Sequence, residues 1–149
     1  MSFLLPELKT KQDVDEAIKK TEDKVLALRF GRKNESSCLR LDDILAKTSP
    51  LLSKMADIYI VEVEDVPVYT HYFDITLIPA TVFFFNGQHI KVDYGTQDHT
   101  KFIGCFQEKQ DFIDLIEVIY RGAMQGKLMI NSPIDRTKIP KFDLLYKDI

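Results

Sequence analysis

The sequence IPATVFFFNGQHIKV at residues 78–92 determines the fold that we predict for this chain. Residues 81–85 form a run of aromatic and β-branched side chains, which is typical of a buried strand. A second apolar run begins at Ile90, and the dipeptide between the two runs, Asn86-Gly87, is preferred in the type I′ turn of a tight hairpin. We therefore predict two antiparallel strands joined by this turn. The three consecutive phenylalanines should alternate between the faces of the sheet, and we expect all of them in the core.

Upstream of the hairpin, the pattern is that of a strand–helix–strand unit. Residues 25–30 are an apolar run that ends at Gly31, and residues 58–63 are another. Between them, Ser36 or Ser37 can cap a helix, which Pro50 should interrupt. The apolar face of this helix comprises Leu41, Ile44, Leu45, Leu52 and Met55. We expect the carboxylates of Asp42 and Asp43 on its solvated face, and we expect a parallel strand pair with a right-handed crossover.

Three further helices are expected around these strands. Thr10 and Asp13 are spaced as in a capping box and begin a first helix, and residues 66–73 form a short second one. The last helix begins near Glu108, and its buried face comprises Phe112, Leu115, Ile116, Ile119 and Ala123. The order α-β-α-β-α-β-β-α predicts an α/β fold with a central mixed four-stranded sheet flanked by helices.

The end of the chain differs from the rest. Residues 127–149 lose the helical periodicity after Gly126 but keep many apolar side chains. We therefore expect a domain at residues 1–126 and a C-terminal extension at residues 127–149 that docks on this domain or on a partner. Aromatic, arginine and methionine side chains are enriched in interfaces. The candidate interface residues are Tyr120, Arg121, Met124, Phe142, Leu145 and Tyr146.

The composition excludes several classes of protein. The chain has 149 residues, a net charge of −3 and two cysteines. This charge argues against gripping nucleic acid through phosphate neutralisation and against a polybasic membrane surface. Two cysteines cannot form a disulfide framework. We expect no transmembrane span and no secretory signal, because long apolar stretches are missing. The three histidines are dispersed, so we expect no metal site and no cofactor.

Two features resemble thioredoxins. The segment Ile78-Pro79-Ala80-Thr81 is similar to the one in which a cis proline opens the third central strand, and Cys38 lies at the start of the long helix after the first strand. The resemblance to the Dim family of thioredoxin-like spliceosomal proteins is closer and covers essentially the whole chain. It is carried by residues 1–6 (MSFLLP), 29–31 (RFG), 37–38 (SC) and 120–123 (YRGA), while residues 83–89 and 144–149 resemble one branch of that family.

This resemblance implies a thioredoxin-like fold with an added C-terminal tail and a nuclear role in pre-mRNA splicing and cell-cycle progression. It also implies contact with a scaffold protein of the tri-snRNP and self-association as a homodimer. Direct binding of nucleic acid is not expected. For Pro79, the resemblance implies a cis peptide bond that fixes the turn into the strand.

The resemblance also places a vestigial redox position at residues 35–38. A dithiol enzyme needs a cysteine at each end of this segment, but here Glu35 occupies the nucleophile position and only Cys38, in the resolving position, is a cysteine. In thioredoxins a buried acid on the first central strand handles protons. Arg29 takes that position and cannot act as a base. A buried arginine must be paired, and we expect a structural ion pair with Glu62.

We therefore expect no catalytic residue and no enzyme activity, and we interpret the chain as a protein-interaction factor. The alternative is a monothiol redox protein or thiol chaperone that uses Cys38, which would require an accessible thiol with a lowered pKa. A disulfide between Cys38 and Cys105 would require Cα atoms within about 7 Å, and we expect two reduced thiols instead.

Overall fold

The predicted hairpin is present in the computed structural model, which describes residues 5–140. Strands β4 (Ala80–Phe85) and β5 (Gln88–Asp93) are antiparallel, with Phe83 opposite Ile90. Both turn residues have positive φ, 49° at Asn86 and 82° at Gly87, as a type I′ turn requires. The local prediction from the dipeptide is therefore confirmed.

The strand–helix–strand unit is also confirmed. Strands β2 (Val25–Gly31) and β3 (Ala56–Glu62) are parallel, and helix α2 (Ser36–Thr48) connects them. Strand β2 also pairs antiparallel with β4, which makes the central order β3-β2-β4-β5. The N-cap prediction was wrong, because Glu35 is the cap and its carboxylate accepts the Ser37 N–H. The helix ends where expected, before a short 3-10 turn at Ser49–Leu52 that contains Pro50.

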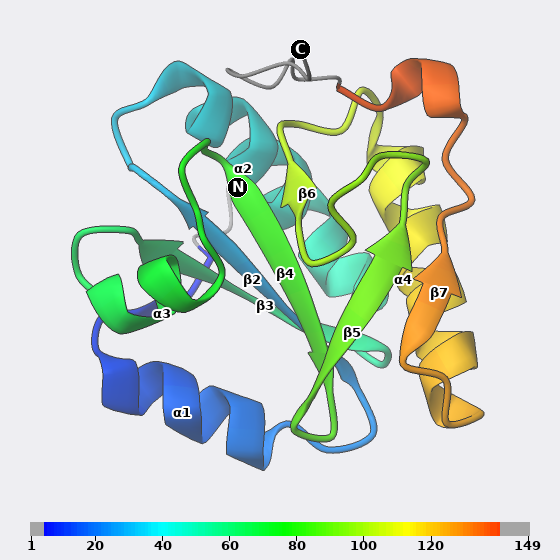
Figure 1. Cartoon of the computed structure of the whole chain (residues 1–149), viewed down its shortest axis with the longest axis horizontal. Helices are drawn as coiled ribbons and strands as arrows, with labels where there is room; N and C mark the ends of the chain where they lie inside the picture. Colours follow the sequence, from blue (N-terminus) through cyan, green and yellow to red (C-terminus); the bar gives the residue numbers. More distant parts are fainter. Residues whose placement is uncertain (1–4, 141–149) are drawn as a thin grey trace, which may run out of the picture.

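Within residues 5–140 the sheet has seven strands, because three short ones extend the predicted four (Figure 1). Strand β1 (Glu7–Leu8) pairs parallel with β3, and β7 (Met129–Asn131) pairs parallel with β5 at the opposite edge. Strand β6 (Phe102–Ile103) pairs antiparallel with the start of β4. Segments of two or three residues are too short to show an alternating pattern, so the sequence did not predict them.

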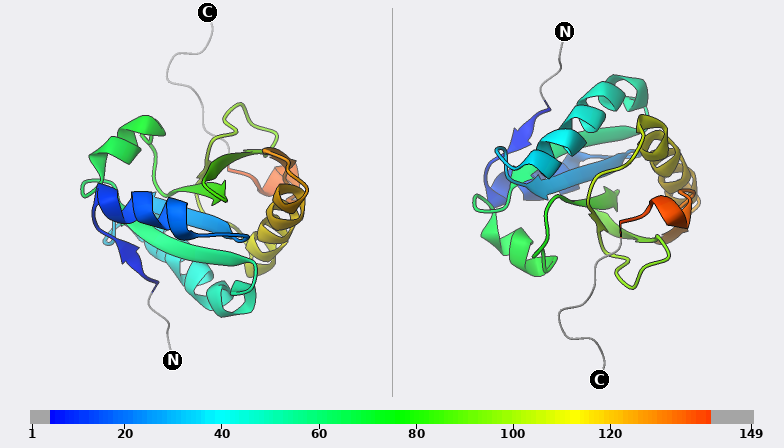
Figure 2. Two further views of the ribbon diagram at one scale, coloured as in Figure 1. Left: turned by 90° about the horizontal axis from the view of Figure 1, so that it is seen from below. Right: turned by 90° about the horizontal axis from the view of Figure 1, so that it is seen from above.

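Helices cover both faces of the sheet (Figure 2). Helices α1 (Lys11–Lys20) and α3 (Pro67–Tyr72) lie on one face, and Val14 of α1 packs there in a cluster with Phe84. Helices α2 and α4 (Lys109–Met124) lie on the other face, where Phe83 and Phe85 join the larger core cluster. The three phenylalanines thus alternate between two buried clusters, as expected.

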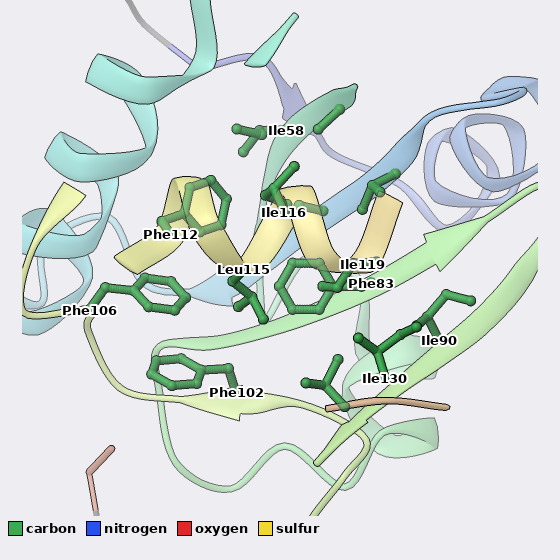
Figure 3. Close-up of a cluster of buried hydrophobic side chains, with 14 of the residues drawn as sticks. Ile58, Phe83, Ile90, Phe102, Phe106, Phe112, Leu115, Ile116, Ile119 and Ile130 are labelled. Atoms are coloured by element: carbon green, nitrogen blue, oxygen red, sulfur yellow. The ribbon is translucent and has the colours of Figure 1, made fainter. Parts of the chain in front are cut away.

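The larger cluster lies between the sheet and helix α4 (Figure 3). Phe102 stacks on Phe106 with ring centroids 4.2 Å apart, and Phe106 lies 5.2 Å from Phe112. The predicted face of α4 also belongs to this cluster: Phe112, Leu115, Ile116, Ile119 and Ala123 are all buried. This aromatic stack joins the loop before α4 to the helix itself.

Residues 127–140 lie against the same chain. Strand β7 adds to the sheet, and Ile130, Ile134 and Ile139 belong to the larger core cluster. A short 3-10 turn at Arg136–Lys138 follows, and Pro140 contacts Gly104. Among the helices of the described residues, none is long and apolar enough to cross a membrane.

Candidate functional site

Glu35 and Cys38, which we propose as a vestigial redox position, lie where the chain leaves β2 and enters α2. Glu35 caps the helix, and its Oε1 accepts the Ser37 N–H at 3.0 Å. This backbone hydrogen bond lowers the pKa of the Glu35 carboxyl. An ionised carboxylate is favourable at a helix N-terminus, because the helix dipole is positive there. Glu35 therefore acts as the N-cap of α2, at the position that the resemblance to thioredoxins assigns to the nucleophile.

Cys38 is fully buried one turn later. Its Sγ accepts the Arg32 N–H at 3.4 Å and lies 3.6 Å from Glu35 Oε2. Burial raises the pKa of the thiol, and the neighbouring Glu35 carboxylate adds to this effect. Because the thiolate is the reactive form, a protonated and enclosed thiol is a poor nucleophile.

Arg29 is fully buried and has two acidic partners. Its Nε and Nη2 donate to the two carboxylate oxygens of Asp42, each at 2.7 Å. Its Nη1 lies 3.6 Å from Glu62 Oε2, so the expected partner is close, although the pair forms no hydrogen bond. Glu62 Oε1 accepts the Lys33 N–H at 3.0 Å.

Asp42 is a partner of Arg29 that the sequence did not predict. It was expected on the solvated face of α2, but it turns inward and forms the bidentate pair with Arg29. The available signal was its spacing, because Asp42 stands four residues after Cys38 and hence on the same side of the helix. The three charged residues Arg29, Asp42 and Glu62 are called the buried ion cluster below.

Gly31 allows the side chains of Arg29 and Cys38 to pack closely together. A Cβ atom at this position would lie 2.6 Å from Arg29 Nη1 and 2.6 Å from Cys38 Sγ. Neither neighbour can move freely, since both side chains are buried. The absent side chain at Gly31 thus leaves the space in which the guanidinium and the thiol lie side by side.

We expect Gly31→Ala to lower the free energy of unfolding by about 1–3 kcal/mol, the usual cost of overpacking a core. Urea denaturation followed by circular dichroism measures this change. The matched control is Ser36→Ala at the exposed first residue of α2, which should stay within about 0.5 kcal/mol of the parent. An unchanged midpoint in the Gly31 variant would show that the buried ion cluster and Cys38 do not need this space.

The other candidate residues are distant from this cluster in the sequence, but the pairing of Phe30 with Ala80 brings Pro79 near the end of β2. The Ile78–Pro79 peptide bond is cis, and the Pro79 carbonyl accepts the Gly104 N–H at 2.8 Å. Cys105, the residue after Gly104, is half-buried, and both cysteines are free. Burial also raises the pKa of the Cys105 thiol.

The interface candidates on α4 are partly accessible. Met124 is 53% exposed, and Arg121 is exposed and pairs with Glu117 at 2.8 Å. Tyr120 is half-buried, with its ring 6.4 Å from that of Phe85. The remaining candidates, Phe142, Leu145 and Tyr146, lie outside the described residues. Within residues 5–140, no group of three or more metal-ligating side chains comes together.

Comparison with known proteins places the chain in a family. The family described as "Mitosis protein DIM1" matches residues 4–136. The chain belongs to this DIM1 family. Within it, thioredoxin-like protein 4B from Mus musculus is 69% identical over 149 residues, the full length of both chains.

More distant DIM1-family relatives also cover most of the chain. Mitosis protein dim1 from Schizosaccharomyces pombe is 33% identical over 91% of this chain and 95% of its own length. Spliceosomal protein DIB1 from Saccharomyces cerevisiae is 33% identical over 90% of this chain and 94% of its own length.

Solved structures show the same fold. The thioredoxin of Fasciola hepatica superposes with a TM-score of 0.61 at 14% identity, covering 76% of this chain and 97% of that protein. The thioredoxin of Plasmodium falciparum gives a TM-score of 0.60 at 19% identity, over the same shares of the two chains. This DIM1-family chain therefore has a thioredoxin-like fold.

Proposed function

We propose that this DIM1-family chain is a non-catalytic protein-interaction factor of pre-mRNA splicing that acts in the nucleus and supports cell-cycle progression. In this proposal it binds a protein of the tri-snRNP and associates with itself as a homodimer. The proposal is supported by its relatives, one of which is named a spliceosomal protein and another a mitosis protein.

The observation that carries the non-catalytic part is the buried ion cluster. Arg29 donates hydrogen bonds to Asp42 at 2.7 Å and lies next to Glu62. The position at which a dithiol enzyme would need a proton acceptor therefore has a permanently charged cation. Glu35 supplies no sulfur, and Cys38 is buried with a raised pKa. These features favour a rigid scaffold over thiol chemistry.

We propose that partner contacts involve the end of α4 and the C-terminal extension. Tyr120, Arg121 and Met124 would form the part on α4, and Phe142, Leu145 and Tyr146 would extend it. An exposed methionine beside an arginine and an aromatic ring has the composition of an interface centre.

A pull-down from nuclear extract with the purified full-length chain tests the proposed partner class. We expect tri-snRNP proteins to be recovered, and Cys38→Ala should recover them equally. Met124→Asp should reduce recovery at least about tenfold, an effect typical of a central interface residue. The matched control is Leu51→Asp on the 3-10 turn after α2, which is 72% exposed and should bind normally. Failure to recover any tri-snRNP protein would contradict the proposal.

The reactivity of Cys38 separates this proposal from a monothiol redox protein. With Cys105→Ser leaving one thiol, we expect iodoacetamide at neutral pH to modify Cys38 at least about tenfold more slowly than free cysteine, because burial shields the thiol and raises its pKa. Mass spectrometry follows the reaction. A rate equal to that of free cysteine, or faster, would favour thiol chemistry.

A further inference from the structure

Strand β7 has an open outer edge. The Leu128 carbonyl accepts the Lys91 N–H, and the Ser132 N–H donates to the Asp93 carbonyl, both at 2.9 Å. Backbone groups of successive strand residues point to alternate edges. Residues 128, 130 and 132 therefore face β5, while the N–H and C=O groups of Met129 and Asn131 point outward. No described strand pairs with this outer edge (Figure 1).

Apolar side chains accompany this edge on the side that carries α4. Leu128 is 47% exposed, and Met124 is 53% exposed at the end of the helix just before it. The two are joined by a tight turn in which the Lys127 N–H donates to the Gly122 carbonyl. Ile130, on the same side of β7 as Leu128, is buried against Gly122 and fixes the strand to the helix. The flexible methionine and the leucine offer an apolar surface to an incoming strand.

One lysine lies near this edge on each face of the sheet. Lys91 is the register partner of Met129, so the two side chains share the face of the sheet opposite α4. Lys127 precedes β7, and its side chain lies next to Gly122, on the side of the sheet that carries α4. Both lysines are exposed, and neither forms an ion pair with another described residue.

We propose that the outer edge of β7 binds an extended segment of a partner protein in which apolar and acidic side chains alternate. The segment adds a strand to the sheet and forms hydrogen bonds with the backbone of Met129 and Asn131. Its apolar side chains cover Leu128 and Met124, close to the ammonium group of Lys127. Its acidic side chains lie on the opposite face, where Lys91 is the nearest positive charge, beyond the exposed side chain of Met129. The inference rests on the proposed interaction role and specifies how the surface at the end of α4 recognises its partner.

The probe is a terminally blocked octapeptide of alternating glutamate with leucine or valine, titrated to about 1 mM into the isotopically labelled full-length chain. We expect saturable shifts of the Met129 and Asn131 amide signals and slower hydrogen exchange at both. A peptide with lysine for glutamate should bind at least about tenfold more weakly. The same loss is expected for a peptide N-methylated at alternate residues, because it cannot donate to the edge.

Asn131→Pro is the decisive variant. The Asn131 N–H points away from β5, so proline removes the outward donor but no hydrogen bond of the existing ladder. We expect an unchanged circular dichroism spectrum and at least about tenfold weaker peptide binding. Lys91→Glu should weaken binding of the acidic peptide and strengthen binding of the lysine peptide, whereas Lys54→Glu, at an exposed site before β3, should change neither.

Other results would overturn the inference. Shifts confined to other strands, or equal binding of the three peptides, would contradict strand addition at β7. Amides of Met129 and Asn131 that are protected only at high protein concentration would assign the edge to a second copy. Protection in the dilute free chain would assign it to the chain's own remaining residues. Recovery of tri-snRNP proteins that is undiminished in Asn131→Pro would contradict strand addition and leave the proposed interaction role intact, so the two proposals can fail separately.

Discussion

Replacing Arg29 by methionine should lower the free energy of unfolding by about 3–5 kcal/mol, because it leaves two carboxylates without their buried cation. The Asp42 and Glu62 side chains are 21% and 15% exposed, so some water reaches them and the loss should lie near the lower end. Urea denaturation of the purified variant gives the value. The control is Arg32→Met, which breaks the exposed pair with Glu64 and should cost less than about 1 kcal/mol.

A triple variant separates the loss of stability on breaking the ion cluster from the net contribution of the whole cluster to the free energy of unfolding. When Asp42 and Glu62 are replaced by leucine together with Arg29→Met, at least roughly half of the loss should be recovered, since an apolar replacement of a whole buried ion cluster is often neutral. If Arg29→Met alone left stability unchanged, the guanidinium would not be the group that stabilises this part of the molecule.

Phe112→Ala should lower the free energy of unfolding by about 3–5 kcal/mol, because it removes a large ring from the centre of the core and leaves a cavity. Phe112 is fully buried at the start of α4 and lies 5.2 Å from Phe106 in the aromatic stack. The measurement is again the urea midpoint, with Leu51→Ala as control. Leu51 is 72% exposed, and its truncation should stay within about 0.5 kcal/mol. Equal effects of the two variants would contradict the placement of Phe112 in the core.

Local patterns predicted most of the fold. A type I′ turn requires positive φ at both central residues, which few residues other than asparagine and glycine adopt easily. The Asn86-Gly87 dipeptide was therefore enough to predict the hairpin. The spacing of Phe112, Leu115 and Ile119 predicted the buried face of α4. A helix of 16 residues repeats the spacing of its apolar side chains over several turns, so the pattern is easy to recognise.

Pairing between distant segments could not be predicted in the same way. Strands β1, β6 and β7 have only two or three residues and are strands because a neighbour supplies hydrogen bonds. In the sequence, Asp42 resembles any exposed acid on a helix. Its role becomes visible only in the tertiary structure, in which Arg29 of β2 lies against it. The role of Gly31 likewise depends on two side chains that the tertiary structure brings together. The charge on Arg29 predicted that a partner exists but did not identify which acid makes the shorter contact.

We propose that a buried ion cluster and a helix cap occupy the position at which thioredoxins carry out thiol chemistry. The most direct test is the rate at which dithiothreitol reduces insulin disulfides in the presence of the purified full-length chain. We expect the same rate as in buffer alone, while a thioredoxin assayed in parallel accelerates the reaction. A clear acceleration by this chain that disappears in Cys38→Ala would contradict the account.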